Sequence, residues 1–174
     1  MNEDEYGALI EMTKAKNGKL LYRASRDGFT GKVFHSKCDN KANTITIIKN
    51  NLNYVFGGYT SSAWNSHSVT VSDANAYIFS LRRNGISKCE KFAIKQAQDA
   101  VYSCSNYGPV FGGGYADIFI INKSNVNFGS CTNFGDSYQL PDGYTKGCEN
   151  TKSYLAGNYN QWVTVEIEVY QIMN

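Results

Sequence analysis

Hydrophobic and polar residues alternate along several short segments of the chain, and this period of two predicts β-strands. The clearest example is residues 162–170, WVTVEIEVY, in which every second position from 163 to 169 is valine or isoleucine. Because successive side chains of a strand point to opposite faces, Val163, Val165, Ile167 and Val169 are expected to share one face. Further strands are predicted at 44–49, 54–59, 76–81, 88–94 and 116–121.

Turn signals join these predicted strands into antiparallel hairpins. An asparagine-rich turn at 50–53 forms one, and Asn84-Gly85, the strongest short hairpin signal in the chain, forms another. Residues 19–25 resemble a short strand or a helix-to-strand junction, with a turn at Asp27-Gly28. Antiparallel strands with one buried face stack as two sheets. We therefore expect a mainly β, α+β fold: two antiparallel sheets packed as a β-sandwich with peripheral helices.

A helix is predicted within residues 1–18. Asn2 is a suitable N-cap with Glu5 three residues later, and Asn17-Gly18 supplies a left-handed stop. This helix is expected to dock through an apolar face formed by Leu9, Met12 and Ile10. A second short helix is expected near 150–156. No linker or internal repeat interrupts the pattern, so residues 1–174 are predicted to form a single domain.

Composition narrows the classes of protein. Hydrophobic residues make up 42% and aromatic residues 14% of the 174 residues, as in a globular, β-rich domain. The net charge of +2, from 17 basic and 15 acidic residues, is too small to indicate nucleic-acid binding. Without a signal peptide or a long apolar segment, we expect a cytoplasmic protein that does not insert into membranes. We also expect a monomer with neither cofactor nor metal.

The glycine triplet Gly112 to Gly114 raises the possibility of a phosphate site. A phosphate loop runs from a strand through glycines into a helix. Here Asp117 and a β-branched, aromatic segment follow instead, which predicts a strand. Turn and packing roles are therefore favoured for these glycines.

Two glutamates could support chemistry. Glu166 and Glu168 would share a strand face at a spacing of about 7 Å, which suits a glycosidase-like acid/base pair. Structural pairing is the more common reason for such a spacing. If either carboxylate is buried, Arg23 or Arg26 is the expected partner.

Histidines and cysteines give weaker signals. His35 and Cys38 form half of a possible zinc motif, and His67 is the other histidine. Both histidines lie in turn-rich segments, so surface or capping roles are expected. Single aspartates near turns are expected to form Asx turns: Asp73, Asp117, Asp136 and Asp142. The five scattered cysteines, at 38, 89, 104, 131 and 148, are expected to be reduced thiols.

Aromatic residues in predicted loops point to a protein interface, because tyrosine and tryptophan are favoured interface anchors. The interface is expected around three segments, 26–28, 57–64 and 112–117. Its residues would be Arg26, Asp27, Gly57, Gly58, Tyr59, Trp64, Gly112, Gly113, Gly114, Tyr115 and Asp117. Further aromatic candidates are Tyr107, Tyr138 and Trp162.

An ordered series of motifs resembles a known family. The series is LLYRASRDGFTGKVFHSKCDNKANTITIIK (20–49), YVFGGYTSSAW (54–64), AYIFSL (76–81), YGPVFGGGYADIFI (107–120), SYQLP (137–141) and SYLAGNYNQWVTVEIEVYQI (153–172). It covers nearly the whole chain and is similar to the TLDc domain of oxidation-resistance proteins. The resemblance implies a two-sheet sandwich, protection against oxidative stress, and binding to the vacuolar proton-pumping ATPase with an effect on its assembly. It implies no catalytic reaction.

One departure from the family concerns the glycine loop. Many relatives have glycine, histidine and aspartate after the FG motif, whereas this chain has Gly114-Tyr115-Ala116-Asp117. The histidine is missing, and Asp117 is retained before the predicted strand. Two alternatives to a non-enzymatic interaction module stay open at this point: a cryptic enzyme, either a hydrolase using Glu166 and Glu168 or a thiol enzyme, and direct oxidant scavenging by cysteines.

Overall fold

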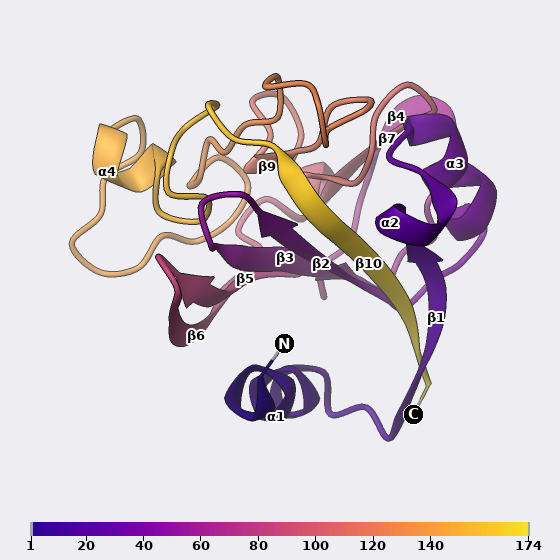
Figure 1. Ribbon diagram of the computed structural model, residues 1–174, viewed down its shortest axis with the longest axis horizontal. Helices are drawn as coiled ribbons and strands as arrows, with labels where there is room; N and C mark the ends of the chain where they lie inside the picture. The colour runs from indigo at the N-terminus through magenta and orange to yellow at the C-terminus, as the bar shows by residue number, and fades with distance from the viewer. Residues whose placement is uncertain (1, 174) are drawn as a thin grey trace.

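Two antiparallel sheets form the centre of the protein in the computed structural model, which describes residues 2–173 (Figure 1). The six-stranded sheet comprises, in order, β1 (Asn17–Arg23), β10 (Thr164–Met173), β2 (Thr44–Asn50), β3 (Val55–Thr60), β5 (Tyr77–Arg83) and β6 (Ile86–Ala93). The four-stranded sheet comprises β4 (His67–Val71), β7 (Val101–Cys104), β8 (Val110–Phe111) and β9 (Ile118–Phe119). The predicted mainly β sandwich is confirmed.

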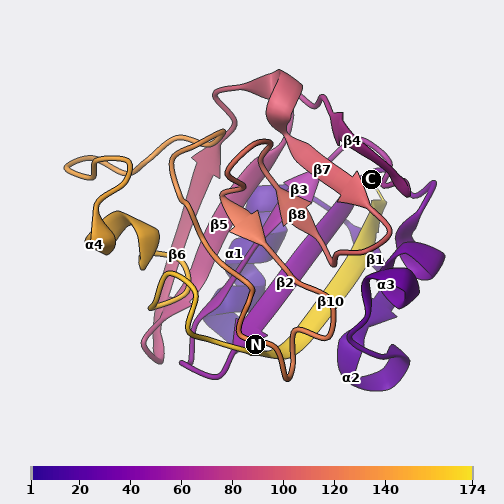
Figure 2. The same cartoon turned by 90° about the horizontal axis from the view of Figure 1, so that it is seen from above.

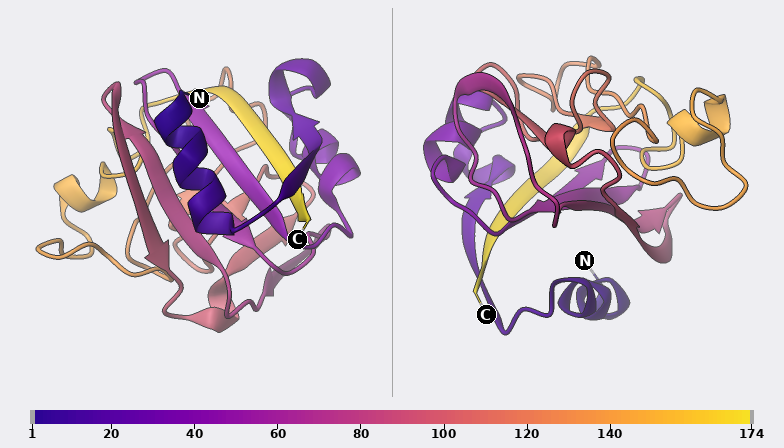
Figure 3. Two further views of the ribbon diagram at one scale, coloured as in Figure 1. Left: turned by 90° about the horizontal axis from the view of Figure 1, so that it is seen from below. Right: turned by 180° about the vertical axis from the view of Figure 1, so that it is seen from behind.

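Helices lie around this sandwich (Figures 1 and 2). They are α1 (Glu3–Thr13), α2 (Ala24–Asp27), α3 (Gly31–Cys38) and α4 (Glu149–Lys152), with a 3-10 turn, η1 (Ala97–Asp99). Figure 2 shows the smaller sheet lying across one face of the larger one. Figure 3 shows α1 on the opposite face, so the six-stranded sheet is the middle layer of the molecule.

Two hydrophobic cores result from this layering. The larger core lies between the sheets and includes Phe56, Trp64 and Phe111. The smaller core lies under α1, where Leu9 packs with residues of the outer face such as Ile45 and Phe79. Burial of apolar surface on both faces explains why β2 and β3 are buried along most of their length and show weak alternation.

The first helix begins as predicted and ends earlier. Asn2 accepts the Glu5 backbone N–H at 2.9 Å, and Glu5 accepts the Asn2 backbone N–H at 3.1 Å, a complete capping box. The left-handed residue that ends the helix is Lys14, with φ of 52°, rather than Asn17-Gly18. Asn17 already starts β1, because pairing with β10 satisfies its backbone better than a further helical turn.

The last strand carries a bulge that the alternation does not reveal. The register shifts between Thr164 and Glu166, so Val165 is an extra residue on β10. Because of this bulge, the side chains of Thr164 and Val165 point the opposite way from the predicted alternation: Thr164 is buried and Val165 is 47% exposed. The prediction of one buried face is therefore correct for Ile167 and Val169 and wrong for Val165.

Both predicted hairpins are present, as β2–β3 and β5–β6. Helices α2 and α3 are absent from the prediction, which placed only a turn at Asp27-Gly28. Thr30 caps α3 by accepting the Val33 N–H at 3.3 Å, and burial of Phe34 against the core holds this short helix in place. Strands β4, β7 and β8 were also not predicted. Of the strand expected at 116–121, only β9 forms.

Candidate functional site

Glu166 and Glu168, the pair considered for a hydrolase, are each engaged in structural contacts on β10. Glu168 Oε1 accepts a hydrogen bond from Arg23 Nε at 2.7 Å, and the Tyr170 hydroxyl donates to its Oε2 at 3.2 Å. Glu166 accepts the Ser25 backbone N–H at 3.0 Å and also the Ser25 hydroxyl. Ser25 lies in the first turn of α2, so Glu166 satisfies a free donor at that helix start. Arg23, one of the two expected partners, thus pairs with Glu168, whereas Glu166 is held by Ser25.

Arg26, the alternative partner, pairs with Asp27 instead. Its Nε donates to Asp27 Oδ1 at 2.9 Å, and its Nη2 donates to Oδ2 at 2.8 Å. The Arg23 backbone N–H also donates to Asp27 Oδ2, at 3.0 Å. The Arg26 side chain, followed by this N–H, lowers the pKa of Asp27 to about 2. Arg26 itself remains exposed on α2, whereas Asp27 is half-buried and closes the turn.

Gly57, Gly58 and Tyr59, expected in an interaction loop, lie instead in β3 within the six-stranded sheet. A Cβ at Gly57 would collide with the Thr46 carbonyl of the adjacent strand. A Cβ at Gly58 would lie 2.6 Å from the Phe111 ring of the other sheet. Both glycines therefore serve close approach within the sandwich, and they are not available to a partner.

Half of the six aromatic candidates also belong to the interior. Trp64, Tyr138 and Trp162 are at most 1% exposed, which corrects their assignment to a contact surface. Trp64 Nε1 donates to a threonine hydroxyl of β2 at 2.9 Å, and the Tyr138 hydroxyl donates to a backbone carbonyl at 2.6 Å. These bonds satisfy the polar atoms of Trp64 and Tyr138 inside the protein, which permits their burial, whereas Trp162 Nε1 is buried without a hydrogen-bond partner within residues 2–173. Tyr107 is half-buried, and Tyr115 is 78% exposed.

The glycine triplet forms the loop between β8 and β9. The Gly112 N–H donates to a backbone carbonyl at 2.8 Å, and its φ of +95° favours glycine. A Cβ at Gly112 would lie 2.7 Å from Asp117 Oδ2, and one at Gly113 would lie 2.8 Å from Asp99 Oδ1. Carboxylates therefore flank these backbone amides, and their negative charge would repel phosphate. The packing role favoured from the sequence is consistent with this geometry.

Asp117 is buried beneath this loop and is not exposed on its surface. Its Oδ1 accepts the Gly135 N–H at 2.7 Å and the Asp136 N–H at 3.0 Å, while its Oδ2 accepts the Ser137 N–H at 2.7 Å. Burial raises the pKa of Asp117 to about 6, and the three N–H donors offset this only in part. Asp117 therefore ties segment 135–137 to the glycine loop, which corrects its expected role as a contact residue.

Asp73 performs a similar structural task on another loop. It accepts the Thr60 hydroxyl at 2.8 Å, the Ser61 hydroxyl at 2.6 Å and the Asn75 N–H at 2.9 Å. Burial acts to raise its pKa, but the hydrogen bonds from Ser61 and Thr60 leave the pKa below its ordinary value. The Asx turn predicted at Asp73 is thus part of a wider network that fixes the end of β3.

The exposed remainder of the predicted surface centres on Tyr115. Together with Asn133, Lys146, Gly147 and Lys152 it lines a hollow of about 130 Å³, which we call the Tyr115 hollow. Its two lysines are held in place: Lys146 pairs with Asp136, and the Lys152 ammonium lies 5.2 Å from the centre of the Tyr159 ring. The sequence does not predict a role for these lysines, because the segment that carries them is remote in sequence from the glycine loop and has no motif of its own.

His35 is buried in α3, contrary to the expected surface role. Its Nδ1 lies 2.6 Å from Asp39 Oδ1, and the Ser66 hydroxyl donates to Asp39 Oδ2 at 2.6 Å. His67 lies on β4 with an exposed side chain. Within residues 2–173, no group of three or more histidine, cysteine or acidic side chains is placed to hold a metal ion.

Most of the cysteines lie in environments that disfavour the thiolate. Burial raises the pKa of Cys38, Cys89 and Cys131. Cys104 is buried, and its sulfur accepts the Ser68 hydroxyl at 3.2 Å. Cys148, the residue before α4, is exposed.

None of the helices described in residues 2–173 has the length and apolar character needed to cross a bilayer.

Comparison with known proteins places these observations in a family. No curated protein matches the sequence. The TLDc domain family matches residues 1–173, which is essentially the whole chain. The strand order of the two sheets, the glycines that let them approach and the buried Asp117 under the glycine loop all fall within this match. The protein therefore belongs to the TLDc domain family, a family related to oxidative stress.

Proposed function

We propose that the protein is a non-enzymatic interaction module that acts in resistance to oxidative stress in the cytoplasm. Its partner, by the family resemblance, is the peripheral, cytosolic sector of the vacuolar proton-pumping ATPase. Binding affects the assembly of that pump.

The observation that supports this proposal is that the candidate acid, base and thiol side chains are engaged in structural contacts or buried. Glu166 and Glu168, the strongest acid/base candidates, are occupied by contacts that hold α2 and β1 to β10. A general acid or base must reach the proton that it transfers, and these carboxylates are committed elsewhere. The raised pKa values of the buried thiols likewise disfavour a cysteine nucleophile. The arrangement favours binding over bond-breaking.

The Tyr115 hollow is the part of the predicted surface that fits a protein partner. Tyr115 is exposed at the tip of a loop whose base is fixed by Asp117, so the backbone of the loop loses little freedom on binding. Lys146 and Lys152 make the rim polar, and each is paired with a carboxylate of the chain, Asp136 and Glu149. A tyrosine anchor within a polar rim is complementary to an apolar pocket with a polar border on the partner.

Assembly would be affected through differential affinity. A module that binds the released sector more tightly than the assembled pump shifts the equilibrium toward release, and the reverse preference stabilises the assembled pump. A hundredfold preference corresponds to about 2.7 kcal/mol, which one well-buried aromatic anchor can supply.

Binding measurements with purified components test the proposal. The domain would be titrated against the isolated peripheral sector and against membranes that carry the assembled pump. We expect measurable affinity for at least one state, weakened about tenfold or more by Tyr115→Ala. Val69→Ala is the matched control, because Val69 is 43% exposed on β4, at the edge of the four-stranded sheet opposite β9. Absence of binding to both states would refute the proposed partner, and equal losses in the two variants would refute the proposed surface.

A further inference from the structure

The four arginines of the chain differ in how their charge is satisfied. Three of them donate hydrogen bonds to a carboxylate: Arg23 to Glu168, Arg26 to Asp27, and Arg82 to Glu5, which anchors α1. Arg83, at the end of β5, is the exception. Its Nη2 lies 3.0 Å from Glu90 Oε2, but neither Nη2 nor Nε has a hydrogen-bond partner within residues 2–173. A guanidinium has five N–H donors, so Arg83 has unused donor capacity.

The side chain of Arg83 is held in place and has lost much of its water. Its guanidinium carbon lies 4.1 Å from the centre of the Tyr154 ring, and the side chain is only 16% exposed. The Tyr154 hydroxyl donates to Glu90 Oε2 at 2.7 Å, which fixes the position of that carboxylate. An anion is attracted more strongly to a cation that folding has already dehydrated than to one surrounded by water. Arg83 therefore has the properties of an anion-binding group.

Arg83 lines a recess of about 360 Å³ between the β5–β6 hairpin and the segment around α4, which we call the Arg83 recess. Nε and Nη2 are the buried guanidinium nitrogens, so an anion in the recess would reach the third nitrogen, Nη1. Tyr54 and Tyr144 contribute aromatic surface to the recess, and Lys88 contributes a second cation. Ile86, which also lines it, is 71% exposed although it is large and apolar.

The charges around the recess favour an anion with a single negative charge. Arg83 and Lys88 supply two positive charges, and Glu90 beside Arg83 supplies one negative charge, so one positive charge is left in excess. A carboxylate matches this excess. A phosphate group would bring a charge of about −1.5 to −2 next to Glu90, which would repel it.

The shape of the recess favours a side chain presented by another protein. Ile86, Lys88 and Asn150 line it and are all exposed, so they form an open rim. Small-molecule sites, in contrast, usually enclose most of the ligand. An exposed isoleucine beside a cation is suited to a partner segment in which an apolar residue adjoins an acidic one.

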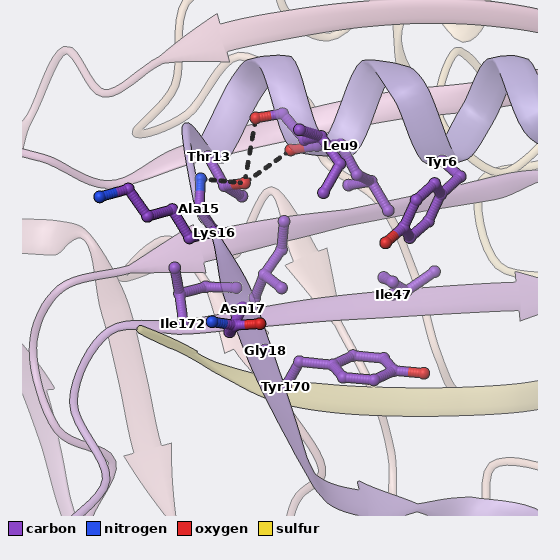
Figure 4. Close-up of a pocket in the computed structure, with 12 residues that line it drawn as sticks. Tyr6, Leu9, Thr13, Ala15, Lys16, Asn17, Gly18, Ile47, Tyr170 and Ile172 are labelled. Carbon is purple, nitrogen blue, oxygen red and sulfur yellow. Dashed lines mark hydrogen bonds between the residues drawn. The ribbon is translucent and has the colours of Figure 1, made fainter. Parts of the chain in front are cut away.

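The groove beside α1 does not discriminate between ligands in this way. It has a volume of about 320 Å³ and is lined largely by apolar side chains, among them Leu9, Ile47 and Ile172 (Figure 4). Within residues 2–173, none of its lining side chains has a buried polar atom without a partner. Apolar burial is non-directional, so this groove does not indicate what binds there.

We propose that the Arg83 recess binds the side-chain carboxylate of an aspartate or glutamate in an extended segment of a partner protein. The carboxylate accepts hydrogen bonds from Arg83 Nη1 and the Lys88 ammonium, and an adjoining apolar residue of the segment packs on Ile86. The recess shares no lining residue with the Tyr115 hollow. It is therefore a second binding site, and it does not depend on the partner proposed for the hollow.

Two five-residue peptides test the proposal: acetyl-Ala-Leu-Glu-Leu-Ala-amide, and the same peptide with glutamine in place of glutamate. Binding would be followed through the backbone N–H NMR signals of Ile86 and Lys88 during a titration. We expect the glutamate peptide to shift these signals to saturation, with a dissociation constant at least about tenfold lower than that of the glutamine peptide. The two peptides have nearly the same shape, so this difference measures the effect of the carboxylate.

Variants locate the site. Arg83→Gln should weaken binding of the glutamate peptide about tenfold, and Lys88→Gln about threefold. Arg26→Gln is the matched control, because Arg26 is an exposed arginine on α2 that also lies beside a carboxylate, and it should leave binding unchanged. Arg83 packs on Tyr154, so its variant could lose stability, whereas Lys88 is exposed and its variant tests the site without that complication.

Three results would overturn the proposal. The first is the absence of a shift with the glutamate peptide up to about 20 mM, and the second is equal affinity for the two peptides. The third is a Lys88→Gln protein that binds the glutamate peptide as tightly as the native protein does. Tighter binding of inorganic phosphate than of the glutamate peptide, at the same two N–H signals, would overturn the assignment to a carboxylate.

Discussion

Replacing Asp117 with asparagine isolates the energetic effect of one buried carboxylate. In the native protein its two oxygens accept three backbone N–H groups, from Gly135, Asp136 and Ser137. The amide of asparagine keeps one acceptor oxygen and turns an NH₂ group toward one of these donors. A buried N–H that loses its partner costs about 1–3 kcal/mol, so Asp117→Asn should be less stable than the native protein at about pH 5.

The size of this difference should depend on pH. Because the folded protein raises the pKa of Asp117 from 3.8 to about 6, the folded state holds the proton more tightly than the unfolded state. The resulting stability is fully present below the unfolded pKa and is lost as the pH rises through the folded pKa. From about pH 5 to about pH 8 this loss amounts to about 1.4 kcal/mol, and over the whole window to about 3 kcal/mol. The variant has no such proton, so its disadvantage should shrink by these amounts.

Urea unfolding of both proteins at several pH values measures this change. The quantity of interest is the difference in free energy of unfolding between the native protein and Asp117→Asn at each pH. Other carboxylates titrate in both proteins and largely cancel in this difference. A difference that stays constant from about pH 5 to about pH 8 would refute the reasoning, because it would mean that Asp117 is ionised throughout and stabilised by its N–H donors.

Further predictions concern packing, the α1 anchor and thiol access. Gly58→Ala should destabilise the fold by about 1–3 kcal/mol in urea unfolding, because its Cβ would lie 2.6 Å from an aromatic ring of the other sheet; an unchanged midpoint would contradict this. Glu5→Ala should cost about 3 kcal/mol by leaving Arg82 without its carboxylate, whereas the double change Glu5→Ala, Arg82→Met should recover much of that loss. A maleimide reagent should modify Cys148 rapidly under native conditions and Cys38 only on unfolding; rapid labelling of Cys38 would show that α3 opens readily.

Loop and strand residues show where prediction from sequence stops. Trp64 and Trp162 look like surface anchors because each lies beside polar, turn-forming residues, yet both fill the core. Their burial depends on partners far away in the chain, such as Phe111 against Trp64, with ring centres 5.7 Å apart. A polar local sequence predicts a loop, but it does not predict which distant residues the loop packs against. Tyr115, with a similar local sequence, is exposed because no segment within residues 2–173 covers it.

Local sequence by itself determined the features that depend on neighbouring residues. The Asn84-Gly85 hairpin and the Asn2 capping box follow from short-range sterics and hydrogen bonding, and they are present as predicted. The ordered motifs identified the family because they preserve this local pattern along the whole chain. Arg23 was one of the two arginines predicted to pair with these glutamates, because a carboxylate removed from water needs a cation, and it pairs with Glu168.

Tertiary structure alone decided which surfaces remain free. The Tyr115 hollow joins residues from 115 to 152, and the groove beside α1 joins residues from both ends of the chain. The bulge at Val165 and the burial of Asp117 likewise depend on the pairing of distant segments. The physical reason is that burial and desolvation are collective: they depend on all the atoms that surround a group, and most of those atoms come from elsewhere in the sequence.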